Sequence, residues 1–175
     1  RIDLLTGTQS IGQGHETTFP QILAKCFGIP SEFINLKQAD TDLIEMGGGH
    51  GSSRATYMGG SAVHFAAAEV IKKGKQLAAD VLEVAVQDIL FKKGKFIVDG
   101  TDREVDLFEL AAVAEKNGCS LNTYNIWERQ DMTFPNGVHA AELEVDSETG
   151  KVKLDRYLVV DDYGAIINPL LVSGQ

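Results

Sequence analysis

The sequence predicts an α+β fold in which a mixed sheet with hairpins packs against helices. Apolar residues recur at helical spacing in several segments, while other short segments alternate apolar and polar residues as strands do. Glycine-containing turns join some of these strands directly, and the order of elements does not suit a doubly wound parallel sheet. The 175 residues contain no internal repeat, low-complexity tract or long linker, so we expect residues 1–175 to form a single α+β piece.

The first part of the chain predicts a strand, a loop, a helix and a second strand. Residues 2–5 suit a strand, and residues 16–27 carry apolar side chains at helical spacing. Gly28 and Pro30 follow this helix, and they end it because glycine caps helices and proline cannot continue them. Residues 33–36 alternate as a strand does.

The middle of the chain predicts a second loop followed by two helices. Residues 41–53 form the loop, and a long helix starts at Arg54. Residues 59–60 are both glycine and cost about 1 kcal/mol each relative to alanine, so we expect another part of the chain to approach the backbone closely there. Two lysines and a glycine at residues 72–74 indicate a helix end, and residues 76–83 suit a further helix.

The last part of the chain predicts two hairpins separated by a helix. Residues 89–98 read as a hairpin with glycine in its turn. An amphipathic helix starts at the N-cap Asp106 and is capped by residues 117–118, which are Asn and Gly. Residues 138–145 and 152–160 alternate around a polar turn and therefore predict an antiparallel pair.

The composition excludes several classes of partner. The chain contains 16 Lys and Arg residues and 25 Asp and Glu residues, which gives a formal net charge of -9. This balance argues against binding nucleic acid or an anionic membrane surface, because no basic stripe is available. No apolar run is long enough to cross a bilayer, and no signal-peptide pattern is present. Cys26 and Cys119 lack C-x-x-C spacing, so we expect a cytoplasmic protein with reduced thiols.

Residues 6–18 form a glycine-rich turn between a predicted strand and a predicted helix. Such a turn can hold phosphate, because glycine lets the backbone approach and the first helical N–H groups have no partners within the helix. Gln13, His15 and Thr17 add side-chain donors and acceptors at the same place. The spacing matches neither G-x-G-x-x-G nor the P-loop, so the alternative is an ordinary connection that caps a helix.

Two later segments have a similar character. Residues 47–54 place glycines, Ser52 and Ser53 before Arg54, whose guanidinium can bind phosphate in a bidentate manner. The alternative for Arg54 is a surface salt bridge. Residues 161–169 end in an Asn168–Pro169 turn, which presents an amide and backbone groups. Together the three segments indicate an extended anionic ligand, and we expect them to converge on it.

The histidines do not suggest a metal site. The four histidines come from separate segments without H-x-x-x-H or H-E-x-x-H spacing, and His64 is expected to pack within its helix. No G-x-S-x-G motif supports a serine nucleophile, and residues 161–162 suit a solvated strand end better than a catalytic acid pair. We therefore predict no protein metal ligand and no catalytic residue in this chain.

Four stretches in this order resemble the large, molybdopterin-binding subunit of the molybdenum hydroxylases, the family of xanthine dehydrogenase, aldehyde oxidase and aerobic carbon monoxide dehydrogenase. They are residues 12–17 (GQGHET), 53–60 (SRATYMGG), 133–139 (TFPNGVH) and 159–169 (VVDDYGAIINP) with the run to 172–175. The pattern covers nearly the whole chain and is most similar to the carbon monoxide dehydrogenase large-chain branch. The fold implied is that of the molybdenum-cofactor-binding domain.

This resemblance implies a chain that binds molybdopterin, usually as its cytosine dinucleotide, with molybdenum held by the dithiolene sulfurs of the cofactor. The matching positions imply cofactor contacts at Gln13, Gly14, His15, Thr17, Ser52, Ser53, Arg54, Asn168 and Gln175. Ser52 is a mild departure, because a smaller residue commonly stands there. The resemblance also implies a molybdenum-dependent oxidoreductase with iron–sulfur and FAD subunits or domains as partners.

The family's catalytic glutamate, in a Gly-x-Gly-Glu context, has no match here. We therefore expect this chain to be a piece of a longer subunit, inactive alone, empty of cofactor when isolated, and prone to self-association through exposed apolar patches. Two other readings remain open at this point. One is a phosphate- or nucleotide-binding module without redox chemistry, and the other is a structural or interaction domain whose glycine loops only turn corners.

Overall fold

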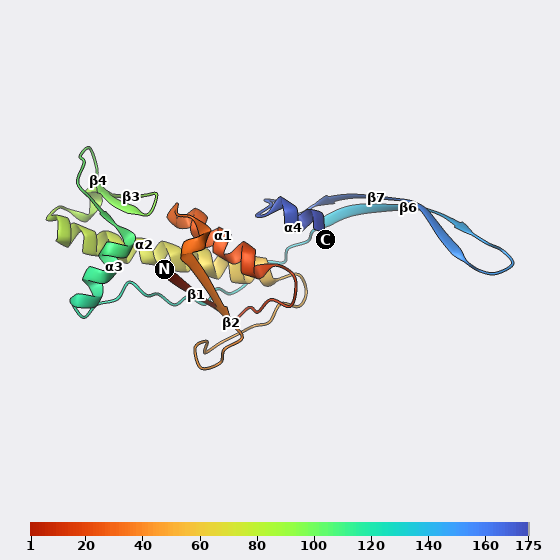
Figure 1. Cartoon of the computed structure of the whole chain (residues 1–175), viewed down its shortest axis with the longest axis horizontal. Coiled ribbons are helices and arrows are strands. Elements are labelled where there is room, and N and C mark those ends of the chain that lie inside the picture. The colour runs from red at the N-terminus through yellow and green to blue at the C-terminus, as the bar shows by residue number, and fades with distance from the viewer. Residues whose placement is uncertain (175) are drawn as a thin grey trace. The chain divides into compact units, whose positions relative to one another are not determined.

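The computed structural model describes residues 1–174 (Figure 1). The chain divides between Glu128 and Arg129 into two compact units, and each is described by itself. Helices and several small sheets occur together, so the predicted α+β class is confirmed. That residues 1–175 form a single piece stays a prediction.

Unit 1 opens with a parallel β-α-β arrangement. Strand β1 (Ile2–Thr6) leads through a loop to helix α1 (His15–Phe27), and strand β2 (Ile34–Gln38) then pairs with β1 in parallel, from Ile2 opposite Ile34 to Thr6 opposite Gln38. The elements were predicted from the sequence, but their parallel pairing was not. Because the carboxyl ends of parallel strands meet at one edge, the loops that follow β1 and β2 start side by side.

A single long helix forms the centre of unit 1. A π-helical segment, η2 (Thr56–Gly60), leads directly into helix α2 (Ser61–Leu82). The predicted helix end at residues 72–74 is wrong, since α2 runs through Gly74 without a break. A Cβ atom at Gly74 would lie 2.2 Å from Cζ of Phe96, so this glycine marks a close packing contact rather than a helix end.

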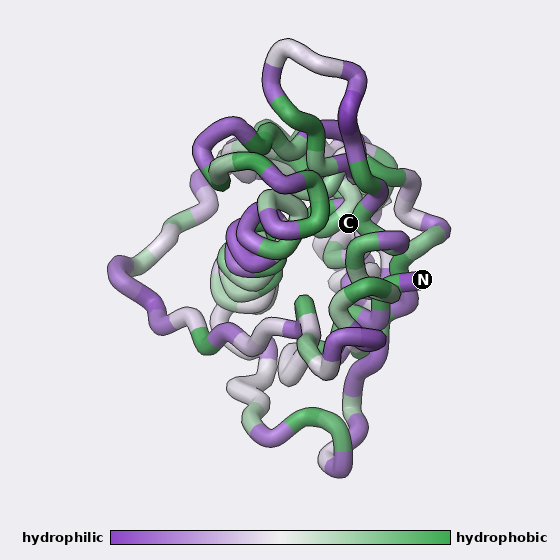
Figure 2. The backbone as a smooth tube through the Cα atoms, turned by 90° about the vertical axis from the view of Figure 1, so that its left-hand side faces the viewer, coloured by the Kyte–Doolittle hydropathy of each residue, from purple (hydrophilic) through white to green (hydrophobic). Residues whose placement is uncertain are grey.

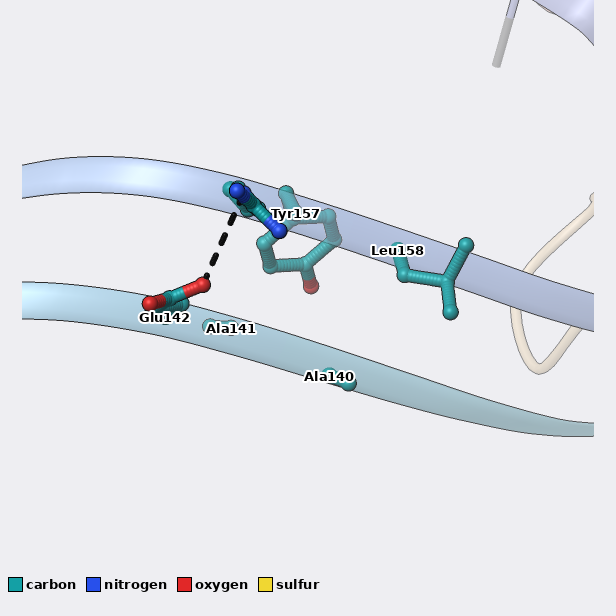
Figure 3. A pocket seen from close by; sticks show the side chains of 6 residues that line it. Ala140, Ala141, Glu142, Tyr157 and Leu158 are labelled. Atoms are coloured by element: carbon teal, nitrogen blue, oxygen red, sulfur yellow. Dashed lines mark ion pairs between the residues drawn. The ribbon is translucent and has the colours of Figure 1, made fainter.

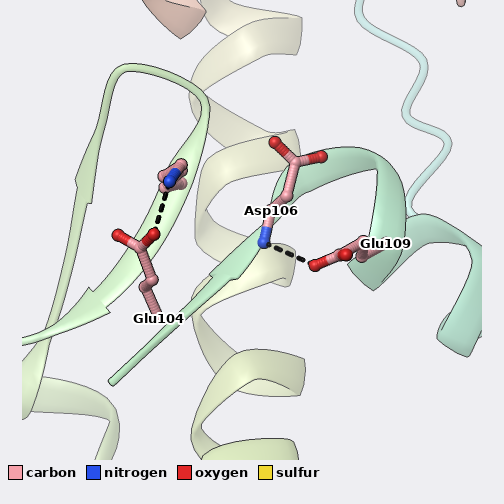
Figure 4. A network of polar contacts seen from close by, with 4 residues as sticks. Glu104, Asp106 and Glu109 are labelled. Atoms are coloured by element: carbon pink, nitrogen blue, oxygen red, sulfur yellow. Dashed lines mark hydrogen bonds and ion pairs between the residues drawn. The ribbon is translucent and has the colours of Figure 1, made fainter. Parts of the chain in front are cut away.

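The remaining elements of unit 1 form a small antiparallel sheet and a third helix. Strands β3 (Ile89–Lys92), β4 (Lys95–Val98) and β5 (Glu104–Asp106) pair in that order, and β5 was missed in the sequence because it is so short. Helix α3 (Leu107–Lys116) begins with the predicted cap at Asp106. Figure 4 shows the backbone N–H of Asp106 bonded to Glu109, and the Lys95–Glu104 ion pair between β4 and β5.

The core of unit 1 lies where α1 and α2 pack together and α2 meets the small sheet and α3. The largest fully buried side chains are Phe19, Phe96, Ile89 and Leu110. Short 3-10 turns, η1 (Ser31–Phe33) and η3 (Val86–Asp88), precede β2 and β3. After α3 the chain is extended, and Trp127 packs its ring edge to face with Tyr57 at 4.7 Å between centroids. Thus η2 is held from two sides, by α1 and by this extended segment.

Unit 2 consists of one long hairpin and a short helix. Strands β6 (Asn136–Val145) and β7 (Val152–Asp162) form the predicted antiparallel pair, with a register shift between Glu142 and Leu143. Helix α4 (Pro169–Gly174) follows, and Asn168 caps it because its Oδ1 accepts from the backbone N–H groups of Leu170 and Leu171.

No helix among the described residues is long and apolar enough to cross a membrane. In Figure 2, hydrophobic and hydrophilic residues alternate over short distances along the backbone tube. Both cysteines are free thiols, with Cys26 half-buried and Cys119 exposed. His64 was expected to pack within its helix, and its ring lies edge to face with that of Phe65 on the same helix, at 5.6 Å between centroids. The side chain is nevertheless exposed, and its Nδ1 also lies 3.4 Å from Sγ of Cys26 on α1.

Candidate functional site

The loop between β1 and α1, residues 7–14, is held in shape by two neighbouring elements. The backbone N–H of Ser10 donates to Oε1 of Gln38 at the end of β2 (2.9 Å), and the Ser10 hydroxyl donates to the carboxylate of Glu16 on α1 (2.7 Å). The bond from Ser10 lowers the pKa of Glu16, with a smaller contribution from Gln38. This anchoring fixes the loop relative to the helix start. Sequence reasoning missed Gln38, because nothing in a sequence reveals a partner 28 residues away.

The predicted residues of this loop occupy the start of α1. Gly14 is the N-cap residue with φ +80°, and no side chain caps the helix there. Oε1 of Gln13 accepts from the backbone N–H of Ile11 (2.6 Å), which leaves the Gln13 amide group as a hydrogen-bond donor. Thr17 is exposed in the first turn. A helix start of this kind, without a side-chain cap, favours an anionic ligand.

His15 is the exception in this loop, because its side chain is buried. It is 3% exposed and stacks on Phe19 with ring centroids 4.7 Å apart and planes 6° apart. Burial lowers the pKa of His15, the backbone of Gln9 and the charge of Glu16 partly oppose this, and His50 lowers it further. The ring of His15 therefore stays neutral at pH values at which an exposed histidine would already be protonated.

The second predicted segment, residues 47–54, precedes η2. Ser52 and Ser53 have φ +61° and +52°, in the left-handed region that side-chain-bearing residues seldom adopt. Arg54 is half-buried and folds back over the loop, so that its Nη2 donates to the carbonyl of Gly48. No ion pair found among residues 1–174 involves Arg54, so the surface salt bridge that was its alternative role is not formed within the described chain.

The two loops meet. A Cβ atom at Gly7 would lie 2.1 Å from the carbonyl oxygen of Met46, and one at Gly47 would lie 2.6 Å from that of Gly7. Glycine is therefore required on both sides of this contact. A Cβ atom at Gly59 of η2 would lie 2.8 Å from Cζ of Phe19 and 3.1 Å from Oγ1 of Thr8, which explains the glycine pair predicted to mark a close approach. The structure thus brings the loop that leads to Gln13 into contact, at Gly7, with the loop that leads to Arg54, at Met46 and Gly47.

The two loops also carry buried polar atoms that lack a hydrogen-bond partner. Within residues 1–174, the buried side-chain atoms that lack a hydrogen bond are Nδ1 of His15, Nδ1 of His50, Nε of Arg54 and Oδ1 of Asn125. The first three belong to the two loops. Because leaving a buried polar group unpaired costs about 1–3 kcal/mol, three such atoms on two loops that touch indicate that a polar ligand completes their hydrogen bonding. The two loops therefore fit an anionic group with several acceptor oxygens.

The third predicted segment lies in unit 2. Asn168 is half-buried and caps α4, and Gln175 lies outside the described residues. In the same unit, Asp161 bonds the Tyr163 hydroxyl (2.5 Å), which raises the pKa of Tyr163, and lies 3.4 Å from Nε2 of His139. That the Asn168 turn converges with the other two stays a prediction.

The hairpin also carries a shallow apolar hollow. Figure 3 shows Tyr157 and Leu158 of β7 above Ala140 and Ala141 of β6, with the Glu142–Arg156 ion pair at one end (3.7 Å). Apart from that exposed pair its lining is mostly apolar, so it offers little to an anionic ligand. No group of three or more His, Cys, Asp or Glu side chains suited to a metal ion occurs in the part of the chain that the structure describes.

Comparison with known proteins now identifies the family. The model of the molybdopterin cofactor-binding domain matches residues 1–175. This chain belongs to that family. It is 35% identical to the 6-hydroxypseudooxynicotine dehydrogenase complex subunit gamma of Paenarthrobacter nicotinovorans, covering 100% of this chain and 23% of that protein. It is 34% identical to the carbon monoxide dehydrogenase large chain of Hydrogenophaga pseudoflava, covering 97% of this chain and 22% of that protein.

Solved structures agree with the family assignment. The carbon monoxide dehydrogenase of Oligotropha carboxidovorans matches with a TM-score of 0.86 and 32% identity, covering 98% of this chain and 22% of that chain. Quinoline 2-oxidoreductase of Pseudomonas putida 86 matches with a TM-score of 0.80 and 30% identity, covering 98% and 23%. The resemblance to molybdenum hydroxylases is confirmed. The chain spans about a fifth of the length of these relatives.

Proposed function

We propose that this chain supplies part of the site that binds molybdopterin, as its cytosine dinucleotide, in a molybdenum-dependent hydroxylase or dehydrogenase similar to the carbon monoxide dehydrogenase large chain. The observation that carries the proposal is the set of unpartnered buried atoms on His15, His50 and Arg54, which belong to two glycine-rich loops that touch at Gly7 and Gly47. Membership of the molybdopterin cofactor-binding domain family supports it independently.

The residues of the two loops have separate roles in this proposal. Gln13 and the start of α1 after Gly14 donate hydrogen bonds to the ligand, with His15 and Thr17 beside them. Ser52, Ser53 and Arg54 bind the phosphates, and Arg54 exchanges part of its bond to the Gly48 carbonyl for a charged partner. Asn168 and Gln175 complete the predicted contacts. The protein binds, orients and shields the ligand here, and no residue of this chain acts as a catalytic group.

In the intact protein, the redox chemistry would come from the bound cofactor. When bound, molybdenum–molybdopterin supplies a redox-active metal held by the dithiolene sulfurs of the pterin. We propose that iron–sulfur and FAD subunits or domains take up the electrons, and that the protein is cytoplasmic. The isolated 175-residue chain, spanning about a fifth of its relatives' length, is expected to be inactive and empty.

Metal and nucleotide analysis of the intact protein tests the proposal. We expect stoichiometric molybdenum, with cytidine nucleotide released by acid. Arg54→Ala should reduce the retained nucleotide, because a hydrogen bond to a charged group contributes about 1.5–3 kcal/mol, or roughly ten- to 150-fold in affinity. Arg103→Ala is the matched control, since Arg103 also donates to a backbone carbonyl, that of Leu82, in the same unit. Nucleotide without molybdenum would favour a phosphate- or nucleotide-binding module, and unchanged retention in Arg54→Ala would favour a structural domain.

A further inference from the structure

The ring of Phe19 supports the buried histidine of the candidate site. Phe19 is fully buried, and its ring is stacked on that of His15, with the centroids 4.7 Å and the planes 6° apart. The two residues are four positions apart on α1, so their side chains lie on the same face of the helix. Nδ1 of His15 is buried and has no hydrogen-bond partner among the described residues. The stack therefore limits the directions in which this unpaired nitrogen can point.

The tip of the Phe19 ring is held by Gly59 in the π-helical segment η2. A Cβ atom at Gly59 would lie 2.8 Å from Cζ and 3.2 Å from Cε2 of Phe19, so the backbone of η2 lies directly on the ring edge. Gly59 follows Arg54 closely in the chain, and the backbone N–H of Met58 donates to the carbonyl of Arg54 (2.8 Å). One helical turn therefore joins the end of the second loop to this contact, and single π-helical turns often occur at functional sites.

A side chain that is already oriented binds a ligand more tightly than a mobile one, because less conformational entropy is lost on binding. His15 is 3% exposed, so it has little room to turn, and turning would also break its stacking on Phe19. The ring is thus kept in one orientation although its Nδ1 is unpaired, which is the arrangement expected of a group that a ligand completes.

We propose that Phe19 and Gly59 are positioning residues of the cofactor site: Gly59 fixes the Phe19 ring, and Phe19 in turn holds the ring of His15 with Nδ1 available to the bound cofactor. This rests on the proposed function and adds to it two residues that act through His15. It applies to either neutral tautomer, since Nδ1 can donate or accept a hydrogen bond. The same contact links the helix that carries His15 to the segment that follows Arg54.

The test measures how fast the intact, cofactor-loaded protein loses cytidine nucleotide into a filtrate at constant pH. We expect Phe19→Leu to lose nucleotide about two- to tenfold faster than the unmodified protein, the range that corresponds to one hydrogen bond between neutral groups. Phe27→Leu is the matched control, since Phe27 is 2% exposed on the same helix and packs edge to face with Phe91 instead of His15. It should lower stability without changing the rate of nucleotide loss.

A second comparison separates the positioning of His15 from a general loosening of the core. His15→Gln should itself speed nucleotide loss, and in that background Phe19→Leu should add little, although it still lowers the urea concentration needed for unfolding. The same factor from Phe19→Leu in both backgrounds, or a factor no larger than that of Phe27→Leu, would overturn the inference. A His15→Gln protein that retains nucleotide normally would overturn it as well.

Gly59→Ala disturbs the same contact while leaving the Phe19 side chain in place, so it tests the inference even where Phe19→Leu does not fold. It should speed nucleotide loss. Gly60→Ala should not, because a Cβ atom there would meet the flexible end of Ile22, 3.1 Å from Cδ1. Equal rates in the two glycine variants would contradict the role of Gly59.

Arg54→Ala distinguishes failure of this inference from failure of the proposed function. Faster nucleotide loss in Arg54→Ala, together with an unchanged rate in Phe19→Leu, would overturn the positioning role alone. If Arg54→Ala retains nucleotide as well, it is the proposed function that is wrong.

Discussion

His15 shows how a single residue can make stability depend on pH. Its ring is buried against Phe19, and burial together with His50 lowers its pKa below the ordinary value of 6.5. The unfolded chain therefore binds a proton at a higher pH than the folded chain does. Between these two pKa values the unfolded state carries more protons, so the free energy of unfolding increases with pH in that window.

We predict that acidification below pH 6.5 destabilises unit 1, by at most about 1.4 kcal/mol per pH unit for this one group, until the lowered pKa of folded His15 is passed. Urea unfolding at a series of pH values, followed by circular dichroism, measures this slope. His15→Gln should reduce it and the exposed His64→Gln should not. Equal slopes in the unmodified protein and His15→Gln would contradict the prediction.

Gly74 is a second residue at which local preference and packing disagree. Alanine is better than glycine within a helix by about 1 kcal/mol, but a Cβ atom here would lie 2.2 Å from Cζ of Phe96. Overpacking a buried contact costs about 1–3 kcal/mol, so we expect Gly74→Ala to be destabilising by up to about 2 kcal/mol. Denaturant titration gives the change in unfolding free energy.

The same substitution in a Phe96→Leu background is the control for this explanation. The shorter side chain leaves room for the new methyl group, so Gly74→Ala should cost less there, or even stabilise. An equal cost in both backgrounds would mean that Phe96 is not the obstacle.

At the scale of elements, the start of α3 shows a local signal that tertiary structure leaves intact. Oδ1 of Asp106 accepts from the backbone N–H of Phe108 (2.8 Å), and Glu109 accepts from the backbone N–H of Asp106 (3.4 Å). Both partners lie within three residues, so the sequence alone could reveal this cap.

We predict that Asp106→Ala lowers the free energy of unfolding by about 1 kcal/mol, because one helix N–H loses its acceptor. Asp106→Asn, whose amide oxygen can still accept, should cost only a fraction of this. Urea unfolding of both variants decides the matter, and a similar loss in the two would show that charge rather than capping matters at this position.

The β6–β7 hairpin differs from the α3 cap, because its own residues do not bury its apolar side chains. The register shift after Glu142 places Leu143 opposite Leu154 and Val145 opposite Val152, so these apolar residues share one face near the turn. All four side chains are more than half exposed. A two-stranded hairpin is at best marginally stable by itself in water.

At the scale of the whole molecule, the exposed hairpin predicts that the isolated chain associates with itself. Sedimentation velocity should show larger species as the protein concentration rises, because covering these apolar side chains removes them from water. Leu143→Thr with Leu154→Thr should weaken the association, while Glu144→Gln with Lys153→Gln, which changes a cross-strand pair of charged residues, should not. A monomer at every concentration would contradict the prediction.

The candidate site was predictable to the extent that it depends on local sequence. Gln13, Gly14 and Arg54 were named because glycines, polar side chains and helix starts lie close together in the chain. His50 was not selected, because a lone histidine between glycines does not reveal that its Nδ1 is buried in the folded chain. Gln38 could not be found for the same reason.

By itself the sequence determined the α+β class, most of the helices and strands, the cap at Asp106 and the family resemblance, since each rests on periodicity or motifs within short stretches. Only the tertiary structure decided the parallel pairing of β1 with β2, the passage of α2 through Gly74, and the contact of the two loops at Gly7 and Gly47. These features depend on contacts between residues far apart in the chain, and such contacts leave no periodic signal in a single sequence.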